Sequence, residues 1–207
     1  MTDDIETVRK MVGDAIFGNM NTPDLPELML QDSHYVFMYG TFRYGFPRYE
    51  QMKKRFKLLG SGWTSEEDYL MYNALSSGGS AFPIASETPL NDYDYTDYGH
   101  VFGDLFLVST DTMTYLDCIE SNGEMYQREL VSVKVHTKDK NEDGSVDWKP
   151  RTVSAWMYVG CPEFWEGAKN VKQMKKNKDK GYLYTLDLCE SFWSTTNDYY
   201  LSHHYLM

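Results

Sequence analysis

Hydrophobic and polar residues alternate most clearly in the middle of this chain, and this pattern predicts strands. Between positions 129 and 137, apolar residues fall on one face and polar residues on the other: Val131, Val133 and Val135 against Ser132, Lys134 and His136. A period of two residues is typical of a half-buried strand. Apolar runs of strand character predict further strands over 34–39, 69–72, 101–108 and 152–159.

A longer period in three other segments predicts helices. Residues 3–17 have five apolar residues on one face, namely Ile5, Val8, Val12, Ala15 and Ile16. A second helix is predicted over 48–59, ending at Gly60, and a third over 109–121. Strands and short helices follow each other without regular strand–helix–strand alternation. This order favours an α+β fold, with a curved or closed mixed sheet and short flanking helices.

Composition narrows the class of protein. The 207 residues are 42% hydrophobic and 15% aromatic, as in a globular protein. A net charge of −11 argues against a general nucleic-acid binder, and no apolar run is long enough to span a membrane. Cys118, Cys161 and Cys189 are far apart, which indicates neither a zinc site nor a disulfide framework. With no secretory pattern at the N-terminus, we expect a cytoplasmic protein.

One carboxylate is predicted to face the core. On a helical count from Met113 at zero, Leu116 falls at about 300° and Glu120 at about 340°. Asn122-Gly123 supplies a helix stop just beyond Glu120. Burial should raise the pKa of this carboxyl group, which suits a general base working near neutral pH. The alternative is a structural Glu bonded to backbone or to an Arg.

Two neighbouring acids fit other roles. Asp117 falls at about 40°, at the border of the apolar face, where capping or structural bonding is expected. Glu124 follows the glycine stop and should face solvent. Arg128 is interpreted as structural.

A loop after the first predicted strand can bind an anion. It consists of Tyr39, Gly40, Thr41 and Phe42. Glycine at a strand end lets the backbone approach a ligand and turns successive amides towards an anion. A Gly-Thr pair in this position is, however, often only a turn. Arg43 either supports the loop or pairs with a surface acid, and we favour the surface acid.

Four short motifs in order resemble the gamma-glutamylcyclotransferase-like superfamily, and within it the gamma-glutamylamine cyclotransferase branch. They are Tyr-Gly-Thr-Phe-Arg at 39–43, Gly-Asp-Leu-Phe at 103–106, Leu-Asp-x-x-Glu at 116–120 and Tyr-x-Arg at 126–128. The resemblance covers roughly 34–160. It implies a helical extension over 1–33, the family domain over 34–160 and a C-terminal extension over 161–207 packed on the same domain.

The resemblance also implies a reaction. Glu120 would be the acid/base residue, and the loop from Tyr39 to Phe42 would cradle a γ-glutamyl group. Tyr126 would line the pocket or, equally, be a core aromatic at the start of a strand. The α-amine of a small-molecule γ-glutamyl substrate would attack its own γ-carbonyl, releasing 5-oxoproline and an amine without cofactor or metal. This branch commonly has Leu where this chain has Phe42, and Glu where it has Asp104. The amine that the pocket accepts could therefore differ from that of the branch.

Other features leave a rival function open. The segment 139–147 begins like a calcium loop, but Pro150 replaces the bidentate Glu, and a long hairpin turn explains the same residues. The lysine run over 169–180 is either a solvated face or a docking site for an acidic partner. The N-terminal helix, the acidic, tyrosine-rich loop over 87–99, the lysine run and the aromatic tail fit instead a catalytically inactive binding protein on the same scaffold. The aromatic tail consists of Phe192, Trp193, Tyr199, Tyr200 and Tyr205.

Overall fold

The computed structural model describes residues 32–75, 81–92, 94, 96–140, 146–176 and 181–184. The predicted helix over 3–17, Tyr93 and Tyr95 of the acidic loop, and the aromatic tail lie outside the described residues. So do the centre of the calcium-like segment and the end of the lysine run. In the part that is described, no helix is both long and apolar enough to cross a membrane.

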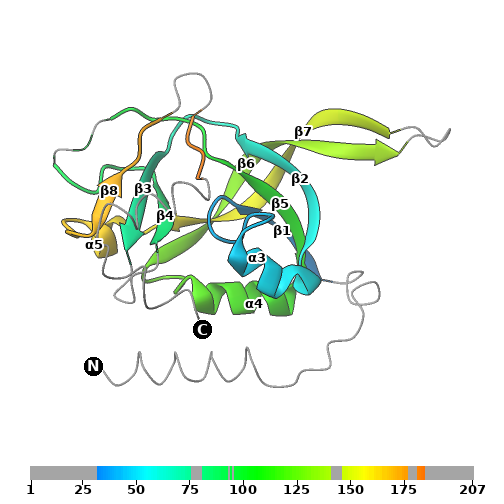
Figure 1. Ribbon diagram of the computed structural model, residues 1–207, viewed down its shortest axis with the longest axis horizontal. Coiled ribbons are helices and arrows are strands. Elements are labelled where there is room, and N and C mark those ends of the chain that lie inside the picture. Colours follow the sequence, from blue (N-terminus) through cyan, green and yellow to red (C-terminus); the bar gives the residue numbers. More distant parts are fainter. Residues whose placement is uncertain are drawn as a thin grey trace.

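Five strands form a closed barrel, which confirms the predicted α+β fold with a closed mixed sheet (Figure 1). Around the barrel they are β1 (Ser33–Met38), β5 (Phe102–Ser109), β2 (Lys57–Thr64), β6 (Tyr126–Lys140) and β7 (Val146–Gly160). Neighbouring strands pair antiparallel except at the closure. There β1 and β7 run parallel, with Val36 opposite Trp156.

A smaller sheet and four short helical segments surround the barrel. The sheet has the order β4 (Ala81–Ser86), β3 (Leu70–Leu75), β8 (Val171–Gln173). The helices are α3 (Pro47–Met52), the 3₁₀ turn η1 (Lys53–Arg55), α4 (Thr110–Ile119) and α5 (Pro162–Trp165). In Figure 1, α3 and α4 lie beside each other on one side of the barrel. The Arg55 guanidinium lies 5.1 Å from the Tyr115 ring centre and joins η1 to α4.

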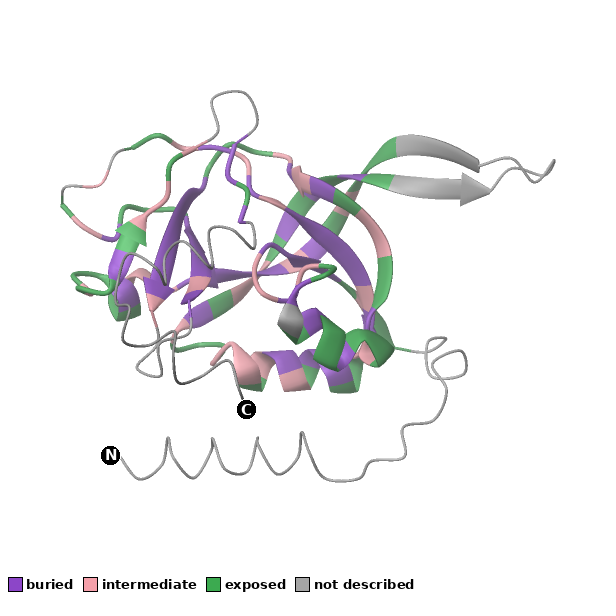
Figure 2. Ribbon diagram, viewed as in Figure 1, coloured by how far each residue is buried: buried purple, intermediate pink, exposed green. Residues whose placement is uncertain are grey.

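Two hydrophobic cores share the barrel strands. Inside the barrel the alternate residues are mostly aliphatic, for example Val133, Val135 and Met157. The opposite faces of the strands pack beneath the helices, where Met113 and Leu116 of α4 join the outer core. Figure 2 shows this burial along the barrel strands, with exposed residues on the outer sides of α3 and α4. The helices therefore cover one outer flank of a filled barrel.

All five predicted strands are confirmed. β1, β3, β5, β6 and β7 overlap the predicted ranges, although β6 and β7 are longer than expected. The alternation between 131 and 136 is as predicted, with the valines buried and the polar residues exposed. β6 and β7 remain paired to Lys140 and Val146, which makes the calcium-like segment the connection of a hairpin.

The predicted helix over 48–59 is wrong in its second half. Helical structure ends at Arg55, and Lys57–Thr64 is strand β2. The periodicity of Met52, Phe56 and Leu59 does not decide the conformation here, because β2 is held in the barrel between β5 and β6. Gly62 makes this pairing possible: a Cβ at that position would lie 2.0 Å from the Lys134 carbonyl oxygen.

Candidate active site

Glu120 lies at the C-terminal end of α4, as the helical count predicted. Ser109 begins the helix, where its side chain accepts a hydrogen bond from the Thr112 amide at 3.3 Å. Met113 and Leu116 are buried against the barrel. Glu120 is the C-cap, and its amide donates to the Leu116 carbonyl at 2.9 Å. Ser121 then takes a φ of 48°, which ends the helix.

The Glu120 carboxyl group is poorly hydrated. The residue is half-buried at the helix end, and burial raises the pKa of its carboxyl above the ordinary value of 4.5. The positive charge of Arg48 opposes this shift. A carboxyl group with a raised pKa can exchange protons closer to neutral pH, which is the property required of an acid/base residue.

Two buried tyrosines are electrostatically coupled to Glu120. Burial raises the pKa of Tyr39 and that of Tyr126, and the negative charge of Glu120 adds to both shifts. The Tyr39 hydroxyl donates to the Tyr158 carbonyl at 2.7 Å and accepts from the Ala85 amide at 3.1 Å. The Tyr126 hydroxyl donates to the Pro83 carbonyl at 3.2 Å. Both hydroxyls stay protonated at neutral pH and tie the barrel to β4.

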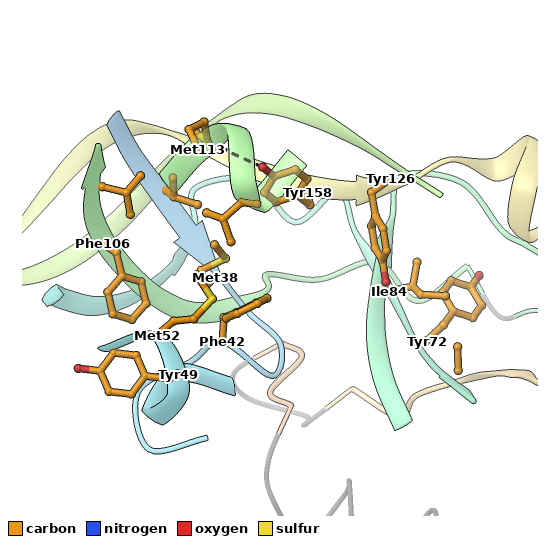
Figure 3. Close-up of a cluster of buried hydrophobic side chains, with 14 of the residues drawn as sticks. Met38, Phe42, Tyr49, Met52, Tyr72, Ile84, Phe106, Met113, Tyr126 and Tyr158 are labelled. Atoms are coloured by element: carbon orange, nitrogen blue, oxygen red, sulfur yellow. Dashed lines mark hydrogen bonds between the residues drawn. The ribbon is translucent and has the colours of Figure 1, made fainter. Parts of the chain in front are cut away.

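Tyr126 begins β6 and is buried in the outer core. Figure 3 shows its ring beside Ile84, and the Trp165 ring centre lies 6.1 Å away in an edge-on arrangement. This agrees with the core-aromatic alternative. Its coupling to Glu120 also keeps it near the candidate acid/base residue.

The loop after β1 packs closely against β4. A Cβ on Gly40 would lie 2.9 Å from Pro83 Cγ, so a larger residue at position 40 would have to displace a proline ring. The Arg43 amide donates to the Gly40 carbonyl at 3.0 Å, and the Phe46 amide to the Arg43 carbonyl at 3.0 Å. Among the residues that the structure describes, the hydrogen bonds of this loop use amides from position 43 onwards and not those of residues 40–42.

Asp104 anchors the far end of this loop. Its carboxylate is buried and accepts hydrogen bonds from Ser61 Oγ at 2.6 Å, the Tyr44 amide at 2.9 Å and Arg43 Nε at 3.3 Å. The expected partner of Arg43 was a surface acid, and this expectation is wrong, because Asp104 is only 2% exposed. Arg43 also donates to the Tyr184 carbonyl at 2.9 Å. Arg43 therefore stabilises the loop from inside.

Phe42 turns its side chain into the outer core, where Figure 3 shows it beside Met38 and Met52. Its ring centre lies 5.9 Å from that of Phe56 in an edge-on arrangement. Gly40 and Thr41 remain half-buried. Arg48, at the start of α3, is exposed and places its guanidinium carbon 5.5 Å from the Phe42 ring centre. Arg48 thus connects the loop with the surroundings of Glu120.

Asp117 has the structural bonding that its position predicted. Its carboxylate accepts from Arg128 Nη1 at 2.7 Å and from the Tyr158 hydroxyl at 2.8 Å. The Arg128 guanidinium carbon also lies 4.9 Å from the Trp156 ring centre, which confirms a structural role. Glu124 is exposed, as expected. Of the three acids, only Glu120 combines a desolvated carboxyl with coupling to Tyr39 and Tyr126.

A separate pocket of about 220 Å³ lies between α4 and the barrel strands β1, β6 and β7. It is lined by His34, Thr110, Met113, Thr114, Asp117, Arg128 and Trp156. Neither Glu120 nor the 39–42 loop belongs to it, so it is distinct from the candidate active site. Within the described ranges, no three His, Cys, Asp or Glu side chains are grouped to hold a metal ion.

Sequence reasoning missed three residues of the candidate site. Arg48 stands in a charged stretch, and the helical pattern did not single it out. Pro83 follows a turn and gave no sign that β4 would contact Gly40; its place in an edge strand explains why a proline is tolerated. Tyr158 belongs to a predicted strand, but its bond to Asp117 depends on tertiary structure.

The sequence and the fold are similar to those of several known proteins. A curated protein of Methanocaldococcus jannaschii, provisionally named a gamma-glutamylcyclotransferase, is 27% identical over 124 residues. The match covers 60% of this chain and 82% of that protein. The crystal structure of a mouse AIG2-like protein is similar with a TM-score of 0.47 and 22% identity, covering 74% of this chain and 96% of that one.

An allophanate hydrolase of Kluyveromyces lactis has a TM-score of 0.48 and 18% identity, covering 79% of this chain and 22% of that one. These two structural similarities do not by themselves show the family of this chain. The family is shown by the sequence: a family model described as gamma-glutamyl cyclotransferase, AIG2-like, matches residues 36–187. That match includes the second half of β1, the 39–42 loop, all of α4 and both long strands. This chain belongs to the gamma-glutamyl cyclotransferase, AIG2-like family.

Proposed function

We propose that this chain is a gamma-glutamylamine cyclotransferase, which converts a γ-glutamyl amine or γ-glutamyl peptide into 5-oxoproline and a free amine. Family membership implies a γ-glutamyl substrate. The observation that carries the proposal is the position of Glu120, half-buried as the C-cap of α4, where burial raises the pKa of its carboxyl group and its charge acts on Tyr39 of the Gly40 loop. The acid/base group and the anion-binding backbone thus lie in one region.

The proposed reaction is an internal aminolysis. Glu120 as carboxylate takes a proton from the substrate's α-ammonium group, and the free amine attacks the γ-carbonyl carbon. A carbon–nitrogen bond forms to close the five-membered ring. The bond to the leaving nitrogen then breaks as Glu120 returns the proton to that nitrogen, and the ring nitrogen gives up its second proton to solvent or to the released amine. Because nucleophile and electrophile belong to one molecule, orientation supplies much of the rate, and a single carboxyl group can serve both steps.

The loop contributes mainly through its backbone. The Tyr39 hydroxyl is engaged by the Tyr158 carbonyl and the Ala85 amide, and the Phe42 ring is packed in the outer core. We assign the amides of Gly40, Thr41 and Phe42 to the carboxylate of the glutamyl group. Asp104 supports this role because it fixes the end of the loop through the Tyr44 amide and Arg43.

The test is a panel of γ-glutamyl amines and dipeptides, with release of 5-oxoproline followed by mass spectrometry. We expect product from the wild type and a loss of about 10²- to 10⁴-fold in kcat for Glu120→Gln, which keeps the shape of the side chain but removes the base. Glu124→Gln is the matched control: it makes the same change on an exposed acid four positions away and should keep the wild-type rate.

Two outcomes would reject parts of the proposal. Equal rates for Glu120→Gln and the wild type would remove Glu120 from the acid/base role. A folded wild type that releases no 5-oxoproline from any substrate, yet binds one of them, would favour the inactive binding protein on the same scaffold.

A further inference from the structure

The pocket between α4 and the barrel brings together hydrogen-bond donors that lack an acceptor. Nη1 of Arg128 donates to Asp117 Oδ2 at 2.7 Å, whereas Nε and Nη2 have no acceptor among the described residues. The same holds for the indole N–H of Trp156, which is half-buried. The Arg128 side chain is only 25% exposed. Partly buried donors of this kind usually have a partner.

The carboxylate of the same pocket is, by contrast, fully engaged. Asp117 Oδ2 accepts from Arg128, and Oδ1 accepts from the Tyr158 hydroxyl at 2.8 Å. The Tyr158 hydroxyl also lies 3.8 Å from Met113 Sδ, a contact that Figure 3 marks. These bonds fix the floor of the pocket before any ligand arrives. A ligand that completes the pocket must therefore bring acceptors rather than donors.

An apolar wall lies beside these donors. Met113 and Trp156 line the pocket, and the Arg128 guanidinium carbon lies 4.9 Å from the Trp156 ring centre. The volume of 220 Å³ corresponds to about seven water molecules. This space suits one small ring that carries one polar group.

We infer that this pocket is a second ligand site, which binds a small carboxylate attached to an apolar ring. The fork of a guanidinium matches the two oxygens of a carboxylate, and the ring would lie against Trp156. Asp117 already balances the charge of Arg128, so the pocket favours a singly charged carboxylate over a doubly charged phosphate. His34 adds positive charge when it is protonated. The inference is independent of the proposed function, because neither Glu120 nor the 39–42 loop lines the pocket.

Benzoate and benzamide test the inference, because they share a ring and differ in the charge of the attached group. Each is titrated into ¹⁵N-labelled wild-type protein, and the NMR shifts report both the affinity and the place of binding. We expect the benzoate shifts to centre on the amides of Thr114 and Arg128 and on the indole N–H of Trp156. The dissociation constant should be about 1 mM, and benzamide should bind about tenfold more weakly.

Variants separate the two ends of the ligand. Arg128→Gln should weaken benzoate about tenfold and leave benzamide within about twofold, whereas Trp156→Leu should weaken both. Arg128→Lys keeps the charge without the fork and should fall between wild type and Arg128→Gln. Lys134→Gln is the matched control, because it removes an exposed cation from the same strand outside the pocket. If Arg128→Gln does not fold, Arg128→Lys and Trp156→Leu still decide the question.

Equal affinity for benzoate and benzamide would overturn the inference, as would an equal loss of benzoate binding in Lys134→Gln. So would the absence of shifts at the pocket, or benzoate shifts that centre on the amides of Gly40 and Thr41. Tighter binding of inorganic phosphate than of benzoate would overturn the assignment to a carboxylate. None of these outcomes depends on the release of 5-oxoproline, so the inference and the proposed function fail separately.

Discussion

Two carboxylates three residues apart on α4 lie in different surroundings. Asp117 is bonded to a guanidinium and a hydroxyl, at 2.7 Å and 2.8 Å. Glu120, at the end of the same helix, is desolvated, and the positive charge of Arg48 partly offsets the rise of its pKa. A carboxylate whose oxygens already accept strong hydrogen bonds is held as part of the structure. One that burial leaves with few partners is more easily protonated, and can therefore move protons.

The largest expected effect on stability is at Asp117. Asp117→Ala removes the partner of Arg128 and leaves the Tyr158 hydroxyl with the weak acceptor Met113 Sδ at 3.8 Å. We expect the free energy of unfolding to fall by about 2 kcal/mol, a value reduced for the partial exposure of the ion pair. Urea denaturation measures this, with the exposed Glu124→Ala expected within about 0.5 kcal/mol of wild type. A loss no larger than that of the control would contradict a structural role for Asp117.

A smaller effect is expected at Tyr158. Tyr158→Phe removes one hydrogen bond to Asp117 and keeps the ring, so unfolding should become easier by about 1 kcal/mol. Tyr35→Phe, which changes an exposed tyrosine, is the control. In the double variant with Asp117→Ala, the total loss of unfolding free energy should be smaller than the sum of the two single losses, because both changes remove the same hydrogen bond. Full additivity would show that the two side chains are not coupled.

The smallest effect should appear at Glu120 and should depend on pH. Because its pKa is raised in the folded state above 4.5, folded protein binds more protons than unfolded protein between 4.5 and the raised value. The contribution of Glu120 is therefore fully present below pH 4.5 and is lost as the pH rises through the folded-state pKa. We expect the Tm of Glu120→Gln, relative to wild type, to increase across this window and then level off. A difference independent of pH, or one matched by Glu124→Gln, would contradict the desolvated state of Glu120.

Local patterns in the sequence predicted much of the fold and the positions of the acidic residues on α4. Helical spacing placed Glu120 at the end of α4, and the position of Asp117 at the border of the apolar face fitted its bonds. These predictions succeed because a helix fixes the direction of each side chain within a few turns. The valines of β6 were predictable for the same reason, since a strand alternates strictly.

Predictions that needed distant partners were less successful. The start of β2 was assigned to a helix because only its pairing with β5 and β6 makes it a strand. The acid that pairs with Arg43 lies 61 positions further along the chain, and its burial was not visible from local charge. The contact of Arg48 with Phe42 spans a turn whose geometry Asp104 determines.

The closure of the barrel has a consequence for how the protein acquires its activity. The parallel contact of β1 with β7, and the bond from the Tyr39 hydroxyl to the Tyr158 carbonyl, join residues 119 or more positions apart. Such distant contacts are slow to form, because the intervening chain must first lose much of its freedom. During synthesis the Gly40 loop leaves the ribosome early, but its support arrives only with β7. A nascent chain that has already made α4 should therefore be unable to turn over substrate until most of the family domain has emerged.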